Sequence, residues 1–353
     1  MNAPQNTVDE SKLALLLNEI VRDMGAAMHA VLVVIGDRIG LYKAMTGAGA
    51  QTAAQIAARA GADERYTREW LNANAAGGWI TYNAGDGTYE LSPEQQFVLS
   101  TMDVPGAYQI VASCFRDSKR LEDAFTSSTG FGWHEHDPGL FEGTERFFRP
   151  NYLAHLLGEW IPALDGVQER LSAGARVADV GCGHGASTLI LAQAFPNSRF
   201  FGFDYHEASI RRARQRAAEA GLDGNVHFEA APAKSYPGAG YDLVAFFDCL
   251  HDMGDPIGAA RHVLSTLAPG GTWMIVEPFA GDRVEDNLNP VGRVFYSAST
   301  VICTPASRAQ EVGLALGAQA GEKRLREIVL EGGFRHFRRA AQTPFNLVFE
   351  ARA

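Results

Sequence analysis

The chain is poor in cysteine, in basic charge and in long apolar runs. Its four cysteines are scattered over 353 residues with no C-x-x-C pair, so neither a zinc site nor a disulfide framework is indicated and a reducing cytoplasm is expected. The net charge of −10 argues against nucleic acid as a main partner, because phosphate binding needs clustered Lys and Arg. The apolar run at 26–35 is too short for a bilayer, which takes about 20 residues, so we expect no membrane span but a helix buried against protein.

The most informative stretch is V-A-D-V-G-C-G-H-G at 177–185. An apolar strand, 176–180, runs into a glycine-rich turn, after which a helix is predicted to start at Ala186. Glycines let the backbone approach a ligand closely, and the helix start offers free N–H groups. A second apolar strand, 199–203, ends in an acidic residue that can bond both hydroxyls of a ribose. The sequence therefore predicts a bound nucleoside-containing cofactor, with Gly181, Gly183, Gly185 and Asp204 around it.

The same turn also fits the dinucleotide pattern G-x-G-x-x-G/A, so NAD is an alternative cofactor. Three features favour S-adenosylmethionine (SAM). Asp179 stands where dinucleotide folds keep the strand apolar, and its carboxylate can attract the ammonium end of SAM directly or through water. P-G-G at 269–271 reads as a tight turn before a buried strand. Two strand-like runs, 334–340 and 345–351, close the chain.

With these motifs, residues 165–353 resemble the class I SAM-dependent methyltransferases. The family's first motif matches V-A-D-V-G-C-G-H-G, its ribose acid matches Asp204, and its P-G-G turn matches 269–271. The terminal hairpin matches the antiparallel seventh strand of that fold. The resemblance implies an α/β class with a Rossmann-like seven-stranded sheet, SAM as the methyl donor and S-adenosylhomocysteine (SAH) as the product.

The resemblance also implies where the cofactor's parts lie. After the third strand, 226–229, the family often has an acid that contacts the adenine amine, but here Pro232 stands near that position. Adenine recognition is therefore expected to rest on backbone groups around Ala231 and Ala233. Tyr205 is expected at the cofactor, and Asp248 is expected near its methionine or sulfonium part.

A candidate base follows the fourth strand, 242–247, at the sheet edge that borders the ligand crevice. His251-Asp252-x-x-Asp255 resembles the H-D-W-x-D run of bacterial and plant O-methyltransferases, with Met253 in place of Trp. The His of that run is a catalytic base, and an imidazole can accept a phenol proton near neutral pH. The resemblance implies O-methylation with His251 as base and Glu277 orienting it. A histidine that merely caps the next helix or lines the pocket is the alternative, and N-, S- or C-methylation stays open.

Two further segments bear on the acceptor. W-H-E-H-D at 133–137 carries donors that zinc or iron can take, but it lacks a third histidine at a convincing spacing. We therefore expect no metal site there, but a loop at the surface or over the pocket mouth. The insert at 280–321 contains aromatic and small residues, which favour a small-molecule acceptor that is apolar or aromatic. Simple packing is the alternative role of these aromatic residues.

The first hundred residues follow a winged-helix order, with helices at 53–60 and 64–76 before a hairpin around Asp86-Gly87. Such a module binds DNA in many regulators, whereas in O-methyltransferases of the hydroxyindole and caffeate type it serves dimerisation and covers the substrate site. Residues 1–100 hold seven basic and eleven acidic side chains, which disfavours DNA.

We therefore expect an α-rich, winged-helix-like dimerisation domain at 1–100, a helical linker at 101–165 and the methyltransferase domain at 166–353. The Leu-rich N-terminal helices favour a homodimer. The alternative function is a winged-helix DNA-binding transcriptional regulator with a SAM-sensing domain.

Overall fold

The computed structural model describes residues 8–353. They fall into two compact units, of which the first ends at Ala112 and the second is Ser113–Ala353. The sequence-based division set 101–165 apart as a linker. In the structure, residues from 113 onward belong with the sheet-containing unit, because their helices share its hydrophobic core through side chains such as Tyr152 and Trp160.

The first unit is helical with a small antiparallel hairpin. Thr52 caps α3 through a capping box and Asp63 caps α4, as their positions before the helices predict. The core gathers Ile56, Trp70 and Ile80 between these helices and the hairpin. The elements are α1 (Glu10–Arg38), α2 (Leu41–Met45), α3 (Ala53–Ala60), α4 (Glu64–Ala76), β1 (Thr81–Asn83), β2 (Thr88–Glu90), α5 (Pro93–Gln96), η1 (Phe97–Thr101) and most of α6 (Pro105–Arg116).

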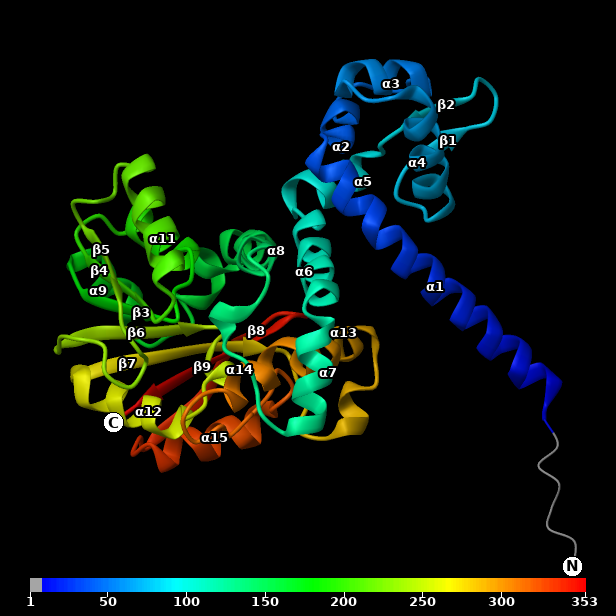
Figure 1. The fold of residues 1–353 in the computed structure, drawn as a ribbon. Helices are drawn as coiled ribbons and strands as arrows, with labels where there is room; N and C mark the ends of the chain where they lie inside the picture. Colours follow the sequence, from blue (N-terminus) through cyan, green and yellow to red (C-terminus); the bar gives the residue numbers. More distant parts are fainter. Residues whose placement is uncertain (1–7) are drawn as a thin grey trace, which may run out of the picture. The chain divides into compact units, whose positions relative to one another are not determined.

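Helix α1, the long blue helix of Figure 1, is 29 residues long and mostly exposed. It buries only Ala30, Val33, Val34 and Gly36. The predicted burial of 26–35 therefore holds for one side of that segment only. The apolar side chains nearer the start of the helix are exposed instead: Leu13, Leu15, Leu16, Leu17, Ile20, Val21, Met24 and Met28.

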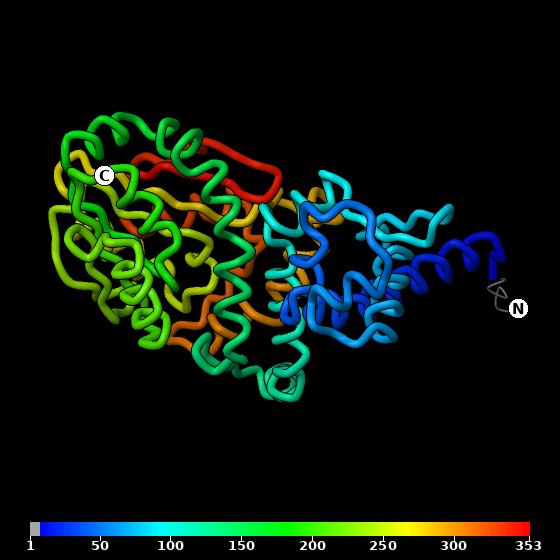
Figure 2. The backbone as a smooth tube through the Cα atoms, turned by 90° about the horizontal axis from the view of Figure 1, so that it is seen from above, coloured from blue at the N-terminus to red at the C-terminus, as the bar shows by residue number. Residues whose placement is uncertain are grey.

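The second unit is built on a seven-stranded sheet in the order β5-β4-β3-β6-β7-β9-β8. The first five strands in that order are parallel, and β9 runs antiparallel to both β7 and β8. Figure 2 shows the red terminal strands beside the yellow β7. The predicted fold class is confirmed. The strands are β3 (Arg176–Val180), β4 (Arg199–Asp204), β5 (Val226–Ala230), β6 (Tyr241–Phe247), β7 (Leu267–Pro278), β8 (His336–Gln342) and β9 (Asn346–Arg352).

The core lies on both faces of this sheet because successive strand residues point to opposite faces. Along β6, Leu243 and Ala245 join one buried cluster, whereas Val244 and Phe246 join the other. The remaining segments of the unit, several of which cover these faces, are α7 (Ser118–Ser127), η2 (Trp133–Glu135), α8 (Gly139–His155), η3 (Leu156–Trp160), α9 (Val167–Ala173), α10 (Ala186–Ala194), α11 (Glu207–Glu219), η4 (Leu250–Asp252), α12 (Pro256–Thr266), η5 (Val284–Asn287), α13 (Pro290–Ala298), η6 (Ser299–Cys303), α14 (Thr304–Arg308) and α15 (Gly321–Glu331).

The P-G-G motif lies inside β7, not in a turn before it as the sequence predicts. Tyr241 of β6 pairs with Leu267, and Leu243 pairs with Thr272. The extra residues of β7 between these two pairs form an irregularity in the ladder, and Gly270 permits it at φ 74°.

None of the described helices combines the length and the apolar character that crossing a bilayer requires.

Candidate functional site

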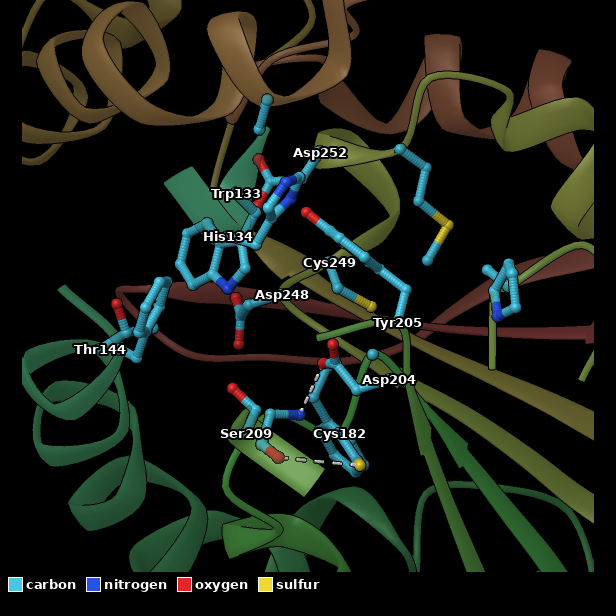
Figure 3. A pocket seen from close by; sticks show the side chains of 18 of the residues that line it. Trp133, His134, Thr144, Cys182, Asp204, Tyr205, Ser209, Asp248, Cys249 and Asp252 are labelled. Atoms are coloured by element: carbon cyan, nitrogen blue, oxygen red, sulfur yellow. Dashed lines mark hydrogen bonds between the residues drawn. The ribbon is translucent and has the colours of Figure 1, made fainter. Parts of the chain in front are cut away.

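The carboxyl ends of β3, β4, β5 and β6 open into one cavity of about 460 Å³. Short loops leave the parallel strands at this edge, so polar residues at the strand ends converge there. Figure 3 shows Asp204, Asp248 and Asp252 around the cavity, together with Trp133 and His134 of η2. The segments around η2, α8 and α14 supply much of the remaining lining, and α10, α11 and α12 add small residues near their starts.

The glycine turn after β3 holds its shape through its own N–H groups. The N–H groups of Gly181 and Cys182 both donate to Phe203 O, at 2.7 and 3.0 Å, and Gly183 N–H donates to Asp204 Oδ2 at 3.0 Å. Gly181 is required sterically, because at φ 76° a Cβ would lie 2.7 Å from Cys249 Sγ. Gly181 and Gly183 line the cavity, whereas Gly185 packs against Phe228 behind it.

Asp204 is a buried carboxylate at the end of β4, only 9% exposed. Besides the bond from Gly183, its Oδ1 accepts the N–H of His206 at 2.8 Å. Burial raises the pKa of Asp204, and these two backbone bonds counteract part of that shift. The side chain is thus fixed in one orientation at the cavity wall. Tyr205 lies beside it on the lining, with its ring edge-on to His134.

The expected adenine end of the cavity is lined by Ala231, Pro232 and Ala233, just after β5. The N–H of Ala231 donates to Asp204 O at 3.0 Å. That donor is therefore already engaged, and recognition through Ala231 depends on its other atoms.

Asp179 lies one layer behind the cavity wall and is not part of the lining. Its Oδ2 accepts the hydroxyls of Ser187 and Thr188 at 2.7 and 2.6 Å, and its Oδ1 has no hydrogen-bond partner among the described residues. Burial raises the pKa of Asp179 to about 6. Ser187 does line the cavity, so it stands between Asp179 and any ligand.

Asp248 projects from the end of β6 with a backbone φ of 51°, in the left-handed region that a non-glycine residue seldom adopts. Tyr152 OH donates to its Oδ2 at 2.9 Å, and Asn346 Nδ2 donates to its Oδ1 at 2.7 Å. Burial raises the pKa of Asp248 to about 7, and the charge of Glu277 adds to the shift. The sequence reasoning missed Tyr152 and Asn346, because α8 and β9 meet β6 only in the folded chain.

His251 and Glu277 form a buried pair. His251 Nδ1 lies 2.6 Å from Glu277 Oε2, and Glu277 Oε1 accepts the N–H of Leu250 at 3.0 Å. The other ring nitrogen, Nε2, lies 3.2 Å from Asp252 Oδ1. His251 is not on the cavity lining, whereas Asp252 is. Burial alone would lower the pKa of His251, but the charges of Asp252 and Glu277 outweigh it and raise the pKa.

Cys303 of η6 completes this cluster. One atom of each of His251, Asp252 and Cys303 that could ligate a metal ion lies within 4.8 Å of the others. We assign no metal ion there, because both ring nitrogens of His251 already face carboxylate oxygens of the protein. Burial raises the pKa of the Cys303 thiol to about 12, which keeps it protonated at neutral pH.

The W-H-E-H-D segment contributes to the cavity wall through Trp133, His134 and Glu135. Its second histidine turns away into the protein, where His136 Nδ1 lies 2.8 Å from Asp117 Oδ2. The segment is thus a pocket loop in which the two histidines face different partners.

The 280–321 insert contributes Ala306, Ala309, Gln310 and Glu311 to the lining, whereas its aromatic segment, α13, is not part of the lining. The apolar lining is supplied instead by Trp133, Phe141, Phe148, Tyr152, Phe247 and Met253.

The polar part of the lining is acidic. It carries one lysine, Lys234, and this lysine pairs with Asp255 and Glu311 at 3.2 and 2.7 Å. The cavity therefore attracts cations and repels anions such as a pyrophosphate. The carboxyl side chains on the lining are Glu135, Glu145, Asp204, Asp248, Asp252, Asp255 and Glu311.

Comparison with known families bears directly on this site. Residues 171–325 match the family described as "Methyltransferase domain", which spans β3 to β7 and the cavity's strand ends. The chain has a methyltransferase domain. Residues 27–101 match the Rv2258c-like winged HTH domain, so the winged-helix interpretation of the first unit is confirmed as well.

Curated relatives match the chain over part of its length. The 27-O-demethylrifamycin SV methyltransferase of Amycolatopsis mediterranei is 37% identical over 103 residues, which are 29% of this chain and 38% of that protein. The trans-aconitate 2-methyltransferase of Paracidovorax citrulli is 33% identical over 146 residues, which are 41% of this chain and 51% of that protein. The chain thus spans about half, or less, of the length of these relatives.

Solved structures match almost the whole chain. The mitomycin 7-O-methyltransferase MmcR superposes with a TM-score of 0.72 at 17% identity, covering 98% of this chain and all of that one. Human N-acetylserotonin methyltransferase, solved with SAM, gives 0.71 at 16% identity, covering 100% and 99%. PigF, solved with SAH, gives 0.73 at 16% identity, covering 95% and 99%. At these identities the likeness establishes the fold of the methyltransferase domain together with its N-terminal helices.

Proposed function

We propose that the protein is a SAM-dependent methyltransferase that transfers a methyl group to a hydroxyl of a small, apolar or aromatic molecule. The observation that carries the proposal is an acidic cavity over a glycine turn in which the N–H groups of Gly181, Cys182 and Gly183 are already engaged. A pyrophosphate needs free N–H donors and a neutral or basic surrounding. A ligand with a sulfonium and an ammonium instead gains from the surrounding carboxylates, so SAM fits this cavity better than NAD.

The ribose, the adenine and the ammonium of SAM have matching groups in the cavity wall or directly behind it. The second lone pairs of the Asp204 oxygens accept the two ribose hydroxyls, because the N–H groups of Gly183 and His206 hold that carboxylate in place. Tyr205 and the segment Ala231–Ala233 would hold the adenine. Gly181 and Asp248 would border the methionine end. Asp179 attracts the ammonium through Ser187 or a bridging water, to which its free Oδ1 can also bond.

When bound, SAM would supply a methyl group attached to a positively charged sulfur. That sulfur is an excellent leaving group, because it departs as a neutral thioether. The protein must hold the acceptor oxygen in line with it and take the acceptor's proton. The aromatic lining formed by residues such as Phe148 and Phe247 favours a flat, apolar acceptor. His251 is the proposed base. Glu277 holds the proton on Nδ1, which leaves Nε2 to receive the acceptor's proton once the side chain of Asp252 gives access to it.

Winged-helix domains are common in DNA-binding regulators, so a SAM-sensing regulator is the second candidate function. The exposed arginines of α4 do not form a basic surface, because Arg65 pairs with Glu69 and Arg68 pairs with Glu64. These i,i+4 pairs neutralise the helix that would enter a DNA groove. A gel-shift assay at moderate salt tests this candidate, and sequence-selective binding would favour the regulator.

We also propose a homodimer formed through α1. The helix exposes a long apolar surface that a protein in water does not normally leave uncovered, with Met24 64% and Met28 74% exposed. A second copy of the same helix covers this surface in a single isologous contact.

All four cysteines are free thiols, which supports a reducing, cytoplasmic location.

Isothermal titration of the purified protein with SAM, SAH and NADH tests the proposed cofactor. We expect SAM and SAH to bind at one molecule per chain and NADH not to bind. Binding of NADH with no response to SAM would overturn the proposal.

Incubation with methyl-labelled SAM and a panel of phenols and enols then identifies the acceptor. If His251 is the base, His251→Ala should lower methyl transfer to that acceptor at least tenfold.

A further inference from the structure

Asp248 and Asp204 stand on opposite sides of the glycine turn. The sheet order places β3 between β4 and β6, so Asp204 at the end of β4 and Asp248 at the end of β6 flank the turn from both sides. Figure 3 shows the two carboxylates facing the same cavity. With the ribose on Asp204 and the adenine toward β5, the remainder of the cofactor would extend over the turn toward Asp248. This step rests on the proposed function.

The surroundings of Asp248 do not neutralise a negative charge. Its two direct partners, Tyr152 OH and Asn346 Nδ2, are neutral donors. The titratable groups that act on it from neighbouring elements are Tyr152 of α8, Glu277 of β7 and His251 of η4. His251 is itself held between Glu277 and Asp252. Within the described chain, no Lys, Arg or His nitrogen forms an ion pair with Asp248, so this fixed carboxyl group lacks a cation.

We propose that Asp248 is the counter-ion of the sulfonium and that its ionisation distinguishes SAM from SAH. The carboxyl group releases its proton to solvent when the positively charged sulfur arrives. During transfer, the methyl C–S bond breaks with its electron pair left on sulfur, the C–O bond forms, and the acceptor's proton goes to the base. The sulfur is then a neutral thioether, and Asp248 takes one proton back from solvent. SAH therefore has no ionic partner in Asp248, and this weakens the binding of SAH in the cavity.

The pKa of about 7 given to Asp248 by burial and by Glu277 makes this exchange measurable at neutral pH. About half of the free protein then carries the proton, so SAM binding at pH 7 should release about half a proton and SAH binding close to none. Between about pH 6 and 8 the affinity for SAM should rise relative to that for SAH, because only SAM requires Asp248 to give up its proton, whereas the titration of Asp179 affects both ligands alike.

The test is isothermal titration of the full chain with SAM and with SAH in buffers of different ionisation enthalpy, which counts the protons released. Asp248→Asn should abolish this release and lower the affinity for SAM by about tenfold or more, while SAH binds within about threefold of wild type. Glu311→Gln is the matched control. It removes an exposed carboxyl of the same cavity that is paired with Lys234, and it should leave the proton count unchanged.

Tyr152→Phe provides a second, independent variant should Asp248→Asn fail to fold. The hydroxyl of Tyr152 lowers the pKa of Asp248, so its removal should raise that pKa and increase the proton released by SAM at pH 7. Equal proton release by SAM and SAH in the wild type, or an unchanged SAM-to-SAH affinity ratio in Asp248→Asn, would overturn the inference. If neither compound binds the wild-type protein, the proposed function itself fails, which is a different result.

Discussion

Asp252→Asn should shift the titration of His251 to lower pH. In the folded protein His251 Nε2 lies 3.2 Å from Asp252 Oδ1. At an effective dielectric constant of about 20, two unit charges at that distance attract by roughly 5 kcal/mol. Asp252 is 23% exposed, so solvent screening reduces the effect, but we still expect the pKa of His251 to fall. Removing the carboxylate charge destabilises the protonated form of His251 relative to the neutral form, so the pKa of His251 must fall.

The assay need not depend on the acceptor. Ring-nitrogen NMR of protein labelled at histidine, with the signal assigned by loss in His251→Gln, follows the protonation of this side chain directly. In the wild type we expect a midpoint well above the ordinary value for histidine, and the pH–rate profile of methyl transfer should rise through the same range. Glu311→Gln serves as the control. An Asp252→Asn midpoint that is unchanged, or moved to higher pH, would refute the described geometry of His251 and its carboxylates.

Three further outcomes are expected. Gly181→Ala should destabilise the protein by roughly 1–3 kcal/mol more than Gly183→Ala in urea denaturation, because both residues have positive φ but only the first added Cβ meets Cys249; equal losses would contradict this steric account. Asp204→Asn should weaken SAM and SAH alike, by about 10–100-fold in calorimetry, since the ribose is common to both, and a loss confined to SAM would contradict ribose binding. Ile20→Glu combined with Met24→Glu on α1 should convert a dimer to a monomer in light scattering without lowering the melting temperature, and a wild-type monomer would refute the dimer.

The elements around the cofactor could be predicted because their signals are local. The strand that ends at Val180 leads directly into glycines that need positive φ, and Asp204 ends the next strand of the chain. Likewise, Thr52 and Asp63 reveal two helix starts through short-range capping bonds. Each of these features depends on residues that are neighbours in sequence.

The rest of the site depends on pairings that the sequence does not show. Tyr152 and Asn346 reach Asp248 from 96 and 98 residues away. Periodicity indicates that Tyr152 lies on a helix, but it cannot indicate which strand end the hydroxyl meets. For the same reason, the sequence does not show that Phe141 and Phe148 of α8 provide part of the aromatic lining. The exposure of the α1 apolar side chains was also hidden, because spacing shows an apolar face without showing what covers it.

The most direct test of the central claim is a crystal structure of the protein with SAH. The account requires the ribose hydroxyls on Asp204, the adenine beside Ala231–Ala233 and the sulfur on the Asp248 side of Gly181. A molecule bound outside this cavity, or bound within it in the reverse direction, would contradict the assignment of the acidic cavity to the adenosyl sulfonium.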